Sequence, residues 1–503
     1  MSKKLPDGWL SIKLDQLFEP RSTRVSPRDM PDAPYIGLEH VEAQTSRLLT
    51  TVPAATMSSS AARFFAGDVL YGRMRPYLNK VVQPQFDGLA SAEFIVFPTL
   101  MGINNKFIHR RLSAGDFVDF ACSQYEGDRP RVKFDQLGKF ELALPPAAEQ
   151  TRIVEKLEEL LSDLDAGVAE LKAAQKKLGQ YRQSLLKAAV EGALTADWRE
   201  AQRKHNSPRE TGAQLLERIL TERRARWEAK QLAKFAEQGK TPPKDWQKKY
   251  PEPVQPDTSG LPELPEGWVW ATIDQLAQVG TGVTPLRSKI AYFNEGTVPW
   301  VTSGALNNEI VISATEFVTE TALKECRLEI YSPGSLLVAM YGEGKTRGKC
   351  SELLIPATIN QAIAAIVLEP EAQPSKAYLK AFLLDSYERM RAQASGGVQP
   401  NLNLQIVKSI TLPLPPNVEQ CEIMQLLDGQ FDQIRQQQRA VELALKQSAA
   451  QRKNILKAAF SGQLVPQDPN DEPASVLLER IRAERAEHEA VRKPRGRKAK
   501  ETA

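Results

Sequence analysis

The chain repeats itself once. Four short motifs occur twice, at offsets of 259 to 270 residues. They are LPDGW (5–9) and LPEGW (264–268), LALPPAAEQ (142–150) and LPLPPNVEQ (412–420), LLKAAVEGAL (185–194) and ILKAAFSGQL (455–464), and LLERI (215–219 and 477–481). A period of this length is too long for a solenoid, so the repeat predicts a pseudo-two-fold molecule with two similar faces.

Each copy contains a proline-free stretch directly after a Pro-Pro pair, at residues 147–207 and 417–465. Apolar residues there advance mostly by steps of four and three, the heptad pattern of helices that pack along a seam. The seam residues are Ile153, Leu157, Leu160, Leu164, Leu171, Leu178, Leu185, Ile423, Leu427, Ile434, Val441 and Ile455. Counted to Gly192 and Gly462, each stretch has about 46 residues and would form a helix roughly 69 Å long. Ordinary core helices average about 11 to 12 residues, so we predict two long coiled-coil helices that pair with each other.

Between these helices, short apolar runs are broken by Gly, Pro and Asn, as in FIVF (94–97), VPWV (298–301) and SLLVAMY (335–341). Such runs are typical of strands, and 503 residues can bury two ordinary cores. The expected fold class is α+β or mixed, with two α/β domains joined by the two long helices. The expected divisions are an N-terminal segment (1–19), a first domain (20–145), a first long helix (146–207), a short charged helix (208–230), a Pro-rich linker (231–263), a second domain (264–413), a second long helix (414–466), and a charged helix with a basic tail (467–503).

The segment AMYGEGKT (339–346) resembles the loosest form of a phosphate-binding loop. Such a loop needs a helix N-terminus directly after it, because helix N–H groups hold the phosphates. The following residues, RGKCSELLIPAT, contain Gly348 and Pro356 and lack a helical apolar period. The equivalent place in the first copy, GDVLYGRMRPYLNK, has no Gly-Lys-Thr. We predict a strand–loop–strand unit in both copies, with an ATP site in the second as the alternative.

These two loops carry cations beside aromatic and amide side chains, which suits a nucleic-acid surface. Lys and Arg neutralise phosphates, while Arg, Asn and Gln can read base edges. The candidate DNA-binding residues are Arg73, Arg75, Tyr77, Asn79 and Lys80 in the first copy and Lys345, Arg347 and Lys349 in the second. The alternative for any one of them is a solvated charged hairpin.

Composition and motifs favour a cytoplasmic binding protein over an enzyme or a membrane protein. The net charge of +4 is the difference between 66 basic and 62 acidic residues, so anionic partners must be met by local patches. The longest apolar run, AIAAIVL (362–368), is far shorter than the roughly 20 residues of a spanning helix. The four cysteines and four histidines suggest no disulfide framework or metal site. No methyltransferase motif or serine nucleophile motif is found, and Asp87 and Glu93 lack the lysine of a nuclease site.

The whole chain resembles the specificity subunit of bacterial type I restriction-modification systems. The resemblance rests on LPDGW and LPEGW, LALPPAAEQTRIVEKLEELL and LPLPPNVEQCEIMQLL, LKAAVEGALTADWR, and the C-terminal LLERIRAERA with its basic tail. It implies two target-recognition domains that each read one half of an interrupted DNA site in the major groove, with two antiparallel helices as spacer. It also implies that the stretch SGGVQPNLN (395–403) and its more basic counterpart CSQYEGDRPRVK (122–133) end the recognition domains. These add the candidates Gln399, Asn401, Asn403, Arg129, Arg131 and Lys133.

The implied partners are double-stranded DNA, two modification subunits that methylate adenine N6, and two restriction subunits that translocate and cut DNA. S-adenosylmethionine, ATP and magnesium are expected on those partners, and no cofactor, metal or catalytic residue is expected in this chain. Two other interpretations compete with this one. The chain could be a self-contained ATPase or nuclease that uses Lys345 and Thr346, or a coiled-coil scaffold with no DNA role.

Overall fold

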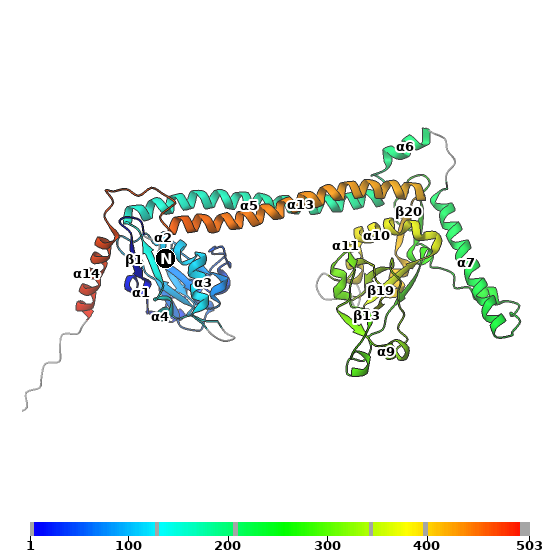
Figure 1. Cartoon of the computed structure of the whole chain (residues 1–503), viewed down its shortest axis with the longest axis horizontal. Helices are drawn as coiled ribbons and strands as arrows, with labels where there is room; N and C mark the ends of the chain where they lie inside the picture. Colours follow the sequence, from blue (N-terminus) through cyan, green and yellow to red (C-terminus); the bar gives the residue numbers. More distant parts are fainter. Residues whose placement is uncertain (1–4, 126–129, 205–209, 342–345, 396–400, 493–503) are drawn as a thin grey trace, which may run out of the picture. The chain divides into compact units, whose positions relative to one another are not determined.

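The computed structural model describes residues 5–125, 130–204, 210–341, 346–395 and 401–492. The chain divides into two compact units (Figure 1). The first unit combines Met1–Ala173 with Ala440–Ala503, and the second unit is Ala174–Arg439. This division differs from the borders expected from the sequence, because both long helices begin in one unit and end in the other.

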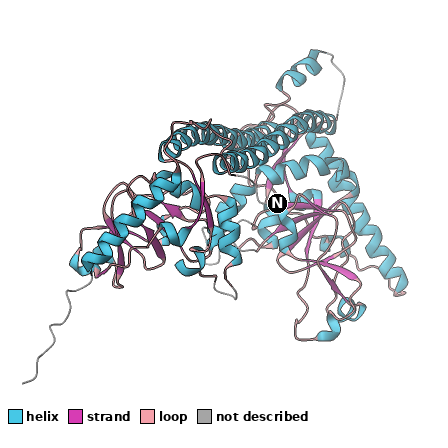
Figure 2. Ribbon diagram, turned by 60° about the vertical axis from the view of Figure 1, so that its left-hand side comes forward, coloured by secondary structure: helices cyan, strands magenta, loops and turns pink. Residues whose placement is uncertain are grey.

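The first unit contains a mixed domain in which small sheets pack with short helices (Figure 2). Its strands are β1 (Leu10–Lys13), β2 (Arg24–Val25), β3 (Pro34–Ile36), β4 (Val52–Pro53), β5 (Ala61–Phe64), β6 (Val69–Gly72), β7 (Val81–Val82), β8 (Gly88–Ala90), β9 (Phe94–Phe97) and β10 (Glu141–Leu144). Its short helices are α1 (Leu14–Leu17), α2 (Asn105–Leu112), α3 (Gly115–Ser123) and α4 (Phe134–Leu137). The sheet orders are β2-β5-β8-β3-β4, β7-β6-β9 and β1-β10. All pairs are antiparallel except β3 with β8.

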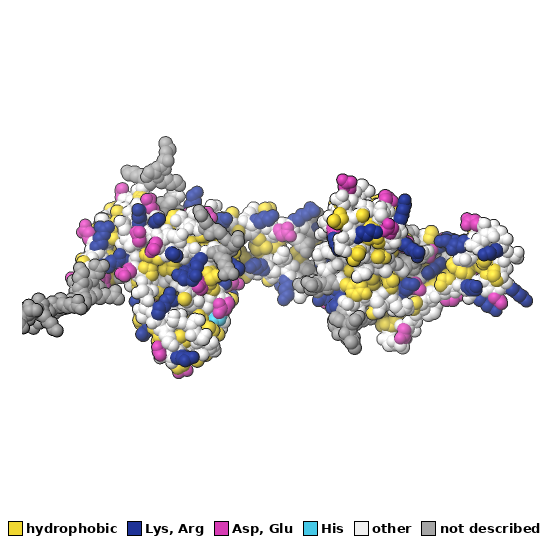
Figure 3. All heavy atoms as spheres, turned by 90° about the horizontal axis from the view of Figure 1, so that it is seen from below, with side chains coloured by type: hydrophobic (Ala, Val, Ile, Leu, Met, Phe, Trp, Pro, Cys, Tyr) yellow, Lys and Arg dark blue, Asp and Glu magenta, His cyan; other side chains and the backbone are white. Residues whose placement is uncertain are grey.

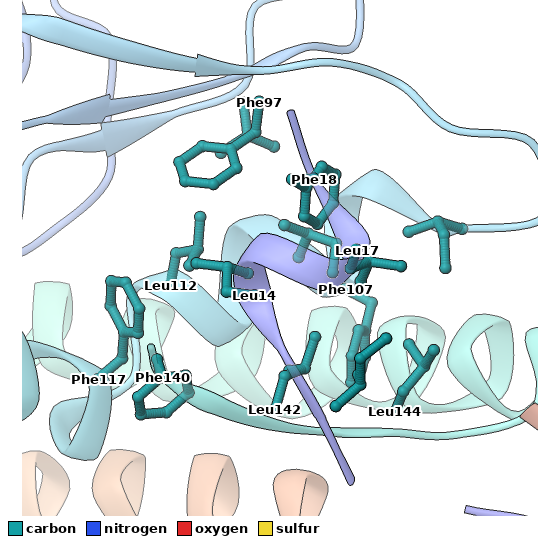
Figure 4. Packing of buried hydrophobic residues seen from close by; sticks show 14 of the residues in the cluster. Leu14, Leu17, Phe18, Phe97, Phe107, Leu112, Phe117, Phe140, Leu142 and Leu144 are labelled. Carbon is teal, nitrogen blue, oxygen red and sulfur yellow. The ribbon is translucent and has the colours of Figure 1, made fainter. Parts of the chain in front are cut away.

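The core of the first unit lies where the β1–β10 ribbon and α1 meet α2 and α3. Figure 4 shows Leu14, Leu17 and Phe18 among phenylalanines from several of these elements. Phe18 meets Phe97 edge-on, with ring centroids 5.4 Å apart. Each such fully buried side chain contributes roughly 1.5 to 3 kcal/mol relative to exposure. The sequence DQL follows both LPDGW and LPEGW, at residues 15–17 and 274–276, and its leucine is buried in both units.

The second unit contains the corresponding mixed domain. Its strands are β11 (Val269–Thr272), β12 (Ala277–Thr281), β13 (Val298–Val301), β14 (Ile310–Val311), β15 (Glu316–Val318), β16 (Leu336–Ala339), β17 (Cys350–Leu353), β18 (Thr358–Ile359), β19 (Ile363–Leu368) and β20 (Thr411–Leu414). Its helices are α6 (Ala196–Lys204), α7 (Gly212–Glu237), α8 (Ile273–Leu276), α9 (Glu320–Glu325), α10 (Lys376–Asp385), α11 (Tyr387–Ser395) and α12 (Leu404–Ser409). The sheet orders are β12-β19-β16-β17-β14, β15-β13-β18 and β11-β20.

Two helices of 44 residues each, α5 (Ala147–Val190) and α13 (Asn417–Phe460), follow the Pro-Pro pairs. At 1.5 Å per residue each is roughly 66 Å long, which confirms the prediction of long helices. Both helices end earlier than the proline-free stretches. Each stops two residues before a glycine, Gly192 or Gly462, whose φ angle of 76° or 72° is typical of a glycine that terminates a helix. The expected continuation to residue 207 is wrong, since α6 is a separate helix.

Within each unit the two long helices run antiparallel. In the first unit Asp165 pairs with Arg452, and Arg152 near the start of α5 pairs with Asp471 beyond the end of α13 at 2.6 Å. In the second unit the Tyr181 hydroxyl donates to Gln430 at 3.1 Å, so a residue late in α5 meets one early in α13.

The predicted seam faces inward along both helices. None of its residues is exposed. The buried members are Ile153, Leu157, Leu185, Ile423, Leu427 and Ile434, and the half-buried members are Leu160, Leu164, Leu171, Leu178, Val441 and Ile455.

Each unit joins the start of one repeat copy to the end of the other. In the first unit α14 (Ala474–Arg492) begins where the Ala474 amide donates to the Gly8 carbonyl at 2.9 Å. In the second unit α7 begins where the Gly212 amide donates to the Gly267 carbonyl at 2.7 Å. The two LLERI motifs lie directly after these contacts. Their apolar residues are buried in both units: Leu215, Leu216 and Ile219, and Leu477, Leu478 and Ile481.

The segment expected as a Pro-rich linker is structured. Helix α7 extends to Glu237, well past the predicted border at residue 230. After a turn, residues Trp246–Lys249 form the short 3-10 helix η5. The chain then meets the second domain, where the Val254 amide donates to Asp274 at 3.0 Å and the Thr272 hydroxyl donates to the Val254 carbonyl at 2.7 Å. The segment is therefore bonded to the second domain at Val254.

Candidate functional site

The first unit presents a tight loop between the antiparallel strands β6 and β7. Residues Pro76–Leu78 form one 3-10 turn, flanked by Arg75 and Asn79 in left-handed conformations with φ of 49° and 48°. Non-glycine residues adopt this conformation rarely, so the surrounding contacts must hold the loop in shape. The result is that Arg75 and Tyr77 are exposed, Tyr77 by 45%.

Two predicted site residues hold this loop from within. The buried Asn79 side chain donates to the Ser113 carbonyl at 2.9 Å, and the Lys80 ammonium donates to the Leu38 carbonyl at 2.7 Å. Gln44 adds a hydrogen bond to the Tyr77 carbonyl at 2.5 Å. Asn79 and Lys80 thus support the loop, which leaves Arg75 and Tyr77 at its surface.

The second candidate segment of the first unit lies directly beside this loop. The Arg75 amide donates to the Pro130 carbonyl at 2.8 Å, and the Val132 amide donates to the Arg73 carbonyl at 3.0 Å. Met74 and Arg131 form an isolated antiparallel bridge. Two stretches that are more than 50 residues apart in the sequence therefore form one surface.

A carboxylate that the sequence analysis did not place at this surface organises its cations. Glu93 accepts from Arg131 at 2.5 Å and pairs with Arg73 at 3.5 Å. Glu93 is therefore an anchor for arginines, and Asp87 accepts the Ala66 amide at 2.9 Å. The separate use of these two carboxylates fits no nuclease pair. Lys133 is exposed at the start of α4, and Arg129 lies outside the described residues.

The corresponding loop of the second unit joins β16 to β17, which pair antiparallel. Strand β17, not a helix, follows Thr346, so the helix N-terminus that a phosphate-binding loop requires is not found after it. Most of the loop itself, residues 342–345, lies outside the described residues. The Lys349 ammonium donates to Asn307 at 2.8 Å, and Arg347 is half-buried. Lys345 lies outside the described residues.

The second unit also brings its two candidate segments together. The Leu402 amide donates to the Met340 carbonyl at 3.1 Å, just as Val132 does to Arg73, and both Leu402 and Val132 are fully buried. Asn401 is exposed next to this anchor.

The residue after the anchor begins a short helix in both units. Asn403 caps α12 by accepting the Ile406 amide at 2.9 Å, and Lys133 occupies the same place before α4. The pairs Arg131 and Asn401, and Lys133 and Asn403, are therefore equivalent. Gln399 lies outside the described residues.

A small cavity of about 230 Å³ in the second unit has Lys349 in its wall. It is lined by Arg182, Asn307, Glu309 and Cys350, among others. Burial raises the pKa of the Cys350 thiol to about 12, so this sulfur is protonated at neutral pH and is a poor nucleophile.

Across the described ranges, none of the helices has the length and apolar character of a membrane span. In that same part of the chain, no three His, Cys, Asp or Glu side chains gather as a metal site would require.

Known proteins resemble this chain in both sequence and structure. Residues 265–443 match the family model described as the type I restriction modification DNA specificity domain. The EcoDI type I restriction enzyme specificity subunit of Escherichia coli is 30% identical over 224 residues, which are 44% of this chain and 50% of that subunit. The EcoKI specificity subunit of Escherichia coli K12 is 26% identical over 365 residues, which are 69% of this chain and 64% of that subunit.

A solved structure describing complex assembly and conformational transition of the type I R-M system contains a similar chain. The two chains are 19% identical with a TM-score of 0.66, over 92% of this chain and 99% of that one. This likeness confirms a mixed fold with long helices. This chain spans about half the length of the EcoDI subunit that it matches. Together the matches confirm the resemblance to type I specificity subunits.

Proposed function

We propose that this chain, which carries a type I restriction modification DNA specificity domain at residues 265–443, is the sequence-specific DNA-binding subunit of a type I restriction-modification complex. Each domain reads one half of a bipartite, asymmetric target in the major groove, where all four base pairs are distinguishable. The subunit performs no chemistry itself. Methylation of adenine N6 and cleavage of DNA belong to its partners.

The observation that carries this proposal is the equivalent construction of the two loop surfaces. In each unit, a loop after β6 or β16 is bonded to the segment just before α4 or α12, through Val132 in one case and Leu402 in the other. If these segments only stabilised the fold, the buried residues Val132 and Leu402 would be sufficient. The exposed residues beside them, Arg131 and Asn401, are instead polar and differ between the units.

That difference in chemistry accounts for an asymmetric target. Arg75 and Lys133 in the first unit are exposed cationic donors that suit guanine or phosphate, and Arg131 beside them is exposed but ion-paired with Glu93. Asn401 in the second unit is a neutral amide, which can both donate to and accept from adenine. Two domains of the same construction with different side chains would therefore recognise two different half-sites.

The long helices α5 and α13 set the distance between the two half-sites and bind the partner subunits. Two modification subunits bind S-adenosylmethionine, and two restriction subunits use ATP and magnesium for translocation and cleavage. The repeat supports this assembly, since each unit offers the same kind of surface to an identical partner.

The test is methylation sequencing of a host that expresses this chain with its modification subunit, followed by binding measurements with the purified complex. We expect one interrupted motif with methylated adenines, and binding to its duplex at least about a thousandfold tighter than to a scrambled duplex, which is the lower end of the roughly 10³ to 10⁷ range of specific binders. Equal affinity for both duplexes would favour a scaffold without a recognition role.

A further inference from the structure

The second unit carries a helical arm that the recognition loops do not use. It comprises residues 227–250: the second half of α7, the following turn and η5. Figure 1 shows α7 as the green helix along the second unit. We call these residues the arm.

Aromatic rings close the arm into a defined hairpin. Trp227 on α7 stacks on Trp246 of η5, with centroids 5.8 Å apart and planes 19° from parallel. Tyr250 meets the edge of Trp227 at 5.4 Å, and Phe235 meets Trp246 at 6.1 Å. Because these rings fix both sides of the hairpin, the side chains around them project from an ordered backbone.

Arginines and lysines are used differently along α7. All four arginines of this helix are ion-paired. They are Arg218 with Glu210 at 2.8 Å, Arg223 with Glu369 at 3.3 Å, Arg224 with Glu228 at 3.2 Å, and Arg226 with Glu369 and Glu371 at 2.8 and 2.7 Å. The contacts of Arg223 and Arg226 attach the helix to the second domain, so these charges are already neutralised.

The lysines of the arm remain largely unneutralised. The arm contains six lysines against Glu228, Glu237 and Asp245, a net charge of +3, and Glu228 is already paired with Arg224. The six are Lys230, Lys234, Lys240, Lys244, Lys248 and Lys249, and all are exposed. Within the described part of the chain, Lys248 pairs with Asp245 at 3.0 Å and the other five make no ion pair. In Figure 3, dark blue Lys and Arg side chains are visible at the right-hand end, where α7 lies.

We propose that the arm binds the phosphate backbone of duplex DNA, independently of sequence. This inference rests on the proposed function. A lysine ammonium is a compact charge with rotatable donors that neutralises phosphate, whereas guanine is read by the planar fork of arginine. The arm offers only lysines for this purpose, so it adds affinity without adding specificity.

A protein partner is a poorer fit to the same surface. Cores of protein interfaces are depleted in lysine and rich in aromatic and apolar side chains. The arm's aromatic rings are packed on one another, and among its large apolar residues Leu232 is the one that is markedly exposed, at 46%.

The test compares two variants of the full chain, each purified with the modification subunits. One carries Lys230→Gln, Lys234→Gln, Lys244→Gln and Lys249→Gln, and the matched control carries arginine at the same four positions. Binding to a labelled mixed-sequence duplex several helical turns long is measured over a series of salt concentrations. The glutamine variant should lower the slope of log Kd against log salt by up to about 3.6, at about 0.9 for each lost phosphate contact. The arginine variant should keep the slope of the unmodified complex.

An unchanged slope in a glutamine variant with native thermal unfolding would overturn the proposal. So would unchanged DNA binding together with loss of a co-purifying partner subunit, since the arm would then contact protein. Failure of the proposed function is distinguishable from both outcomes. It would appear as a lack of sequence discrimination by the unmodified complex, which the arm does not supply.

Discussion

The indole Nε1 of Trp9 donates a hydrogen bond of 2.9 Å to the carboxylate of Glu149, and both side chains are buried. The second unit repeats the pair, with Trp268 donating to Glu419 at 2.8 Å. The tryptophans end the LPDGW and LPEGW motifs and the glutamates lie in PPAAEQ and PPNVEQ. The repeated motifs are therefore the two sides of one contact that fixes each domain to the start of its long helix.

Loss of the indole donor should destabilise the first unit. Trp9→Phe keeps an aromatic ring but removes the pyrrole part of the indole with its N–H, so a buried carboxylate oxygen of Glu149 loses its donor, which costs about 1 to 3 kcal/mol. Urea denaturation of the full chain, followed by circular dichroism, measures the change. Trp246→Phe is the matched control, because its ring contacts lie in the arm and not in this unit. An equal unfolding midpoint for Trp9→Phe and the parent would show that the hydrogen bond contributes nothing.

The stability of the first unit should fall as the pH drops below about 6.5. Burial lowers the pKa of the His109 imidazole to about 4, so the folded chain holds it neutral. A lowered pKa contributes stability that is present above the ordinary value of 6.5 and is lost as pH falls towards the folded value. The full effect is about 3 kcal/mol. The unfolding midpoint of the parent chain should therefore decrease between pH 6.5 and pH 4.5. In His109→Gln, midpoints measured between pH 8 and pH 4.5 should lack this decrease.

The carboxyl of Glu149 supplies a control, because its effect on stability has the opposite pH dependence to that of His109. Burial raises its pKa above the ordinary value, so its contribution is present below that value and is lost as pH rises through the raised one. Glu149→Gln should therefore leave the decline below pH 6.5 in place. A His109→Gln chain that keeps the full decline would assign it to another group.

The repeat predicted two similar domains because its motifs can be matched directly between the two halves of the sequence, and the heptad seam predicted the long helices because it depends on local spacing. Leu157 and Ile434 could be assigned to a packed face from spacing alone. Proximity across the fold could not be assigned this way. Nothing in the sequence near Arg75 says that Pro130 lies beside it, since that pairing depends on how β6 and the start of α4 are placed by the whole domain.

Roles within the candidate site were also only partly readable. Asn79 and Lys80 have the residue types of a DNA contact, yet their side chains bond to backbone carbonyls inside the loop. Glu93 was noticed for a different chemistry, because a carboxylate that pairs with two arginines has no motif of its own. The aromatic pairing of Trp227 with Trp246 likewise lay hidden in a proline-rich segment that composition alone assigns to a linker.

Arg75 should contribute to DNA binding more than any other cation of its loop, since its side chain is exposed while Arg73 is paired with Glu93. We expect Arg75→Ala to cost roughly 1 to 3 kcal/mol and to relax preference at one base pair if it reads guanine. A loss that is equal for all sequences would assign it to phosphate. Arg24→Ala, an exposed arginine on β2, is the matched control. Unchanged binding of Arg75→Ala to the cognate duplex would remove this loop from the interface.

The long helices should set the length of the unread spacer. Seven residues inserted after Ala173 in α5 and after Arg439 in α13 preserve the heptad seam and lengthen each helix by about 10.5 Å. At about 3.4 Å per base pair, the preferred spacer should grow by roughly three base pairs. Adenine-methylation sequencing reports the spacer directly. A single-residue insertion is the control, since it rotates the seam by about 100° and should abolish assembly. A folded, active seven-residue variant with the original spacer would contradict this role.

Exchange of the first domain should change one half of the target and leave the other half and the spacer intact. The structure indicates where to cut: residues 20–140 can be replaced by the equivalent segment of a related protein while the β1–β10 ribbon, paired from Leu10 with Leu144 to Lys13 with Glu141, is kept. That ribbon and the Trp9–Glu149 contact hold the domain to its helix, so the hybrid domain meets the same platform and folds on its own core. Methylation sequencing of cells that carry the hybrid and its modification subunit gives the new motif. The reciprocal exchange of the second domain should change only the other half. If either exchange altered both halves together, the two domains would be reading DNA as one coupled surface, and separate recognition by each unit would have to be abandoned.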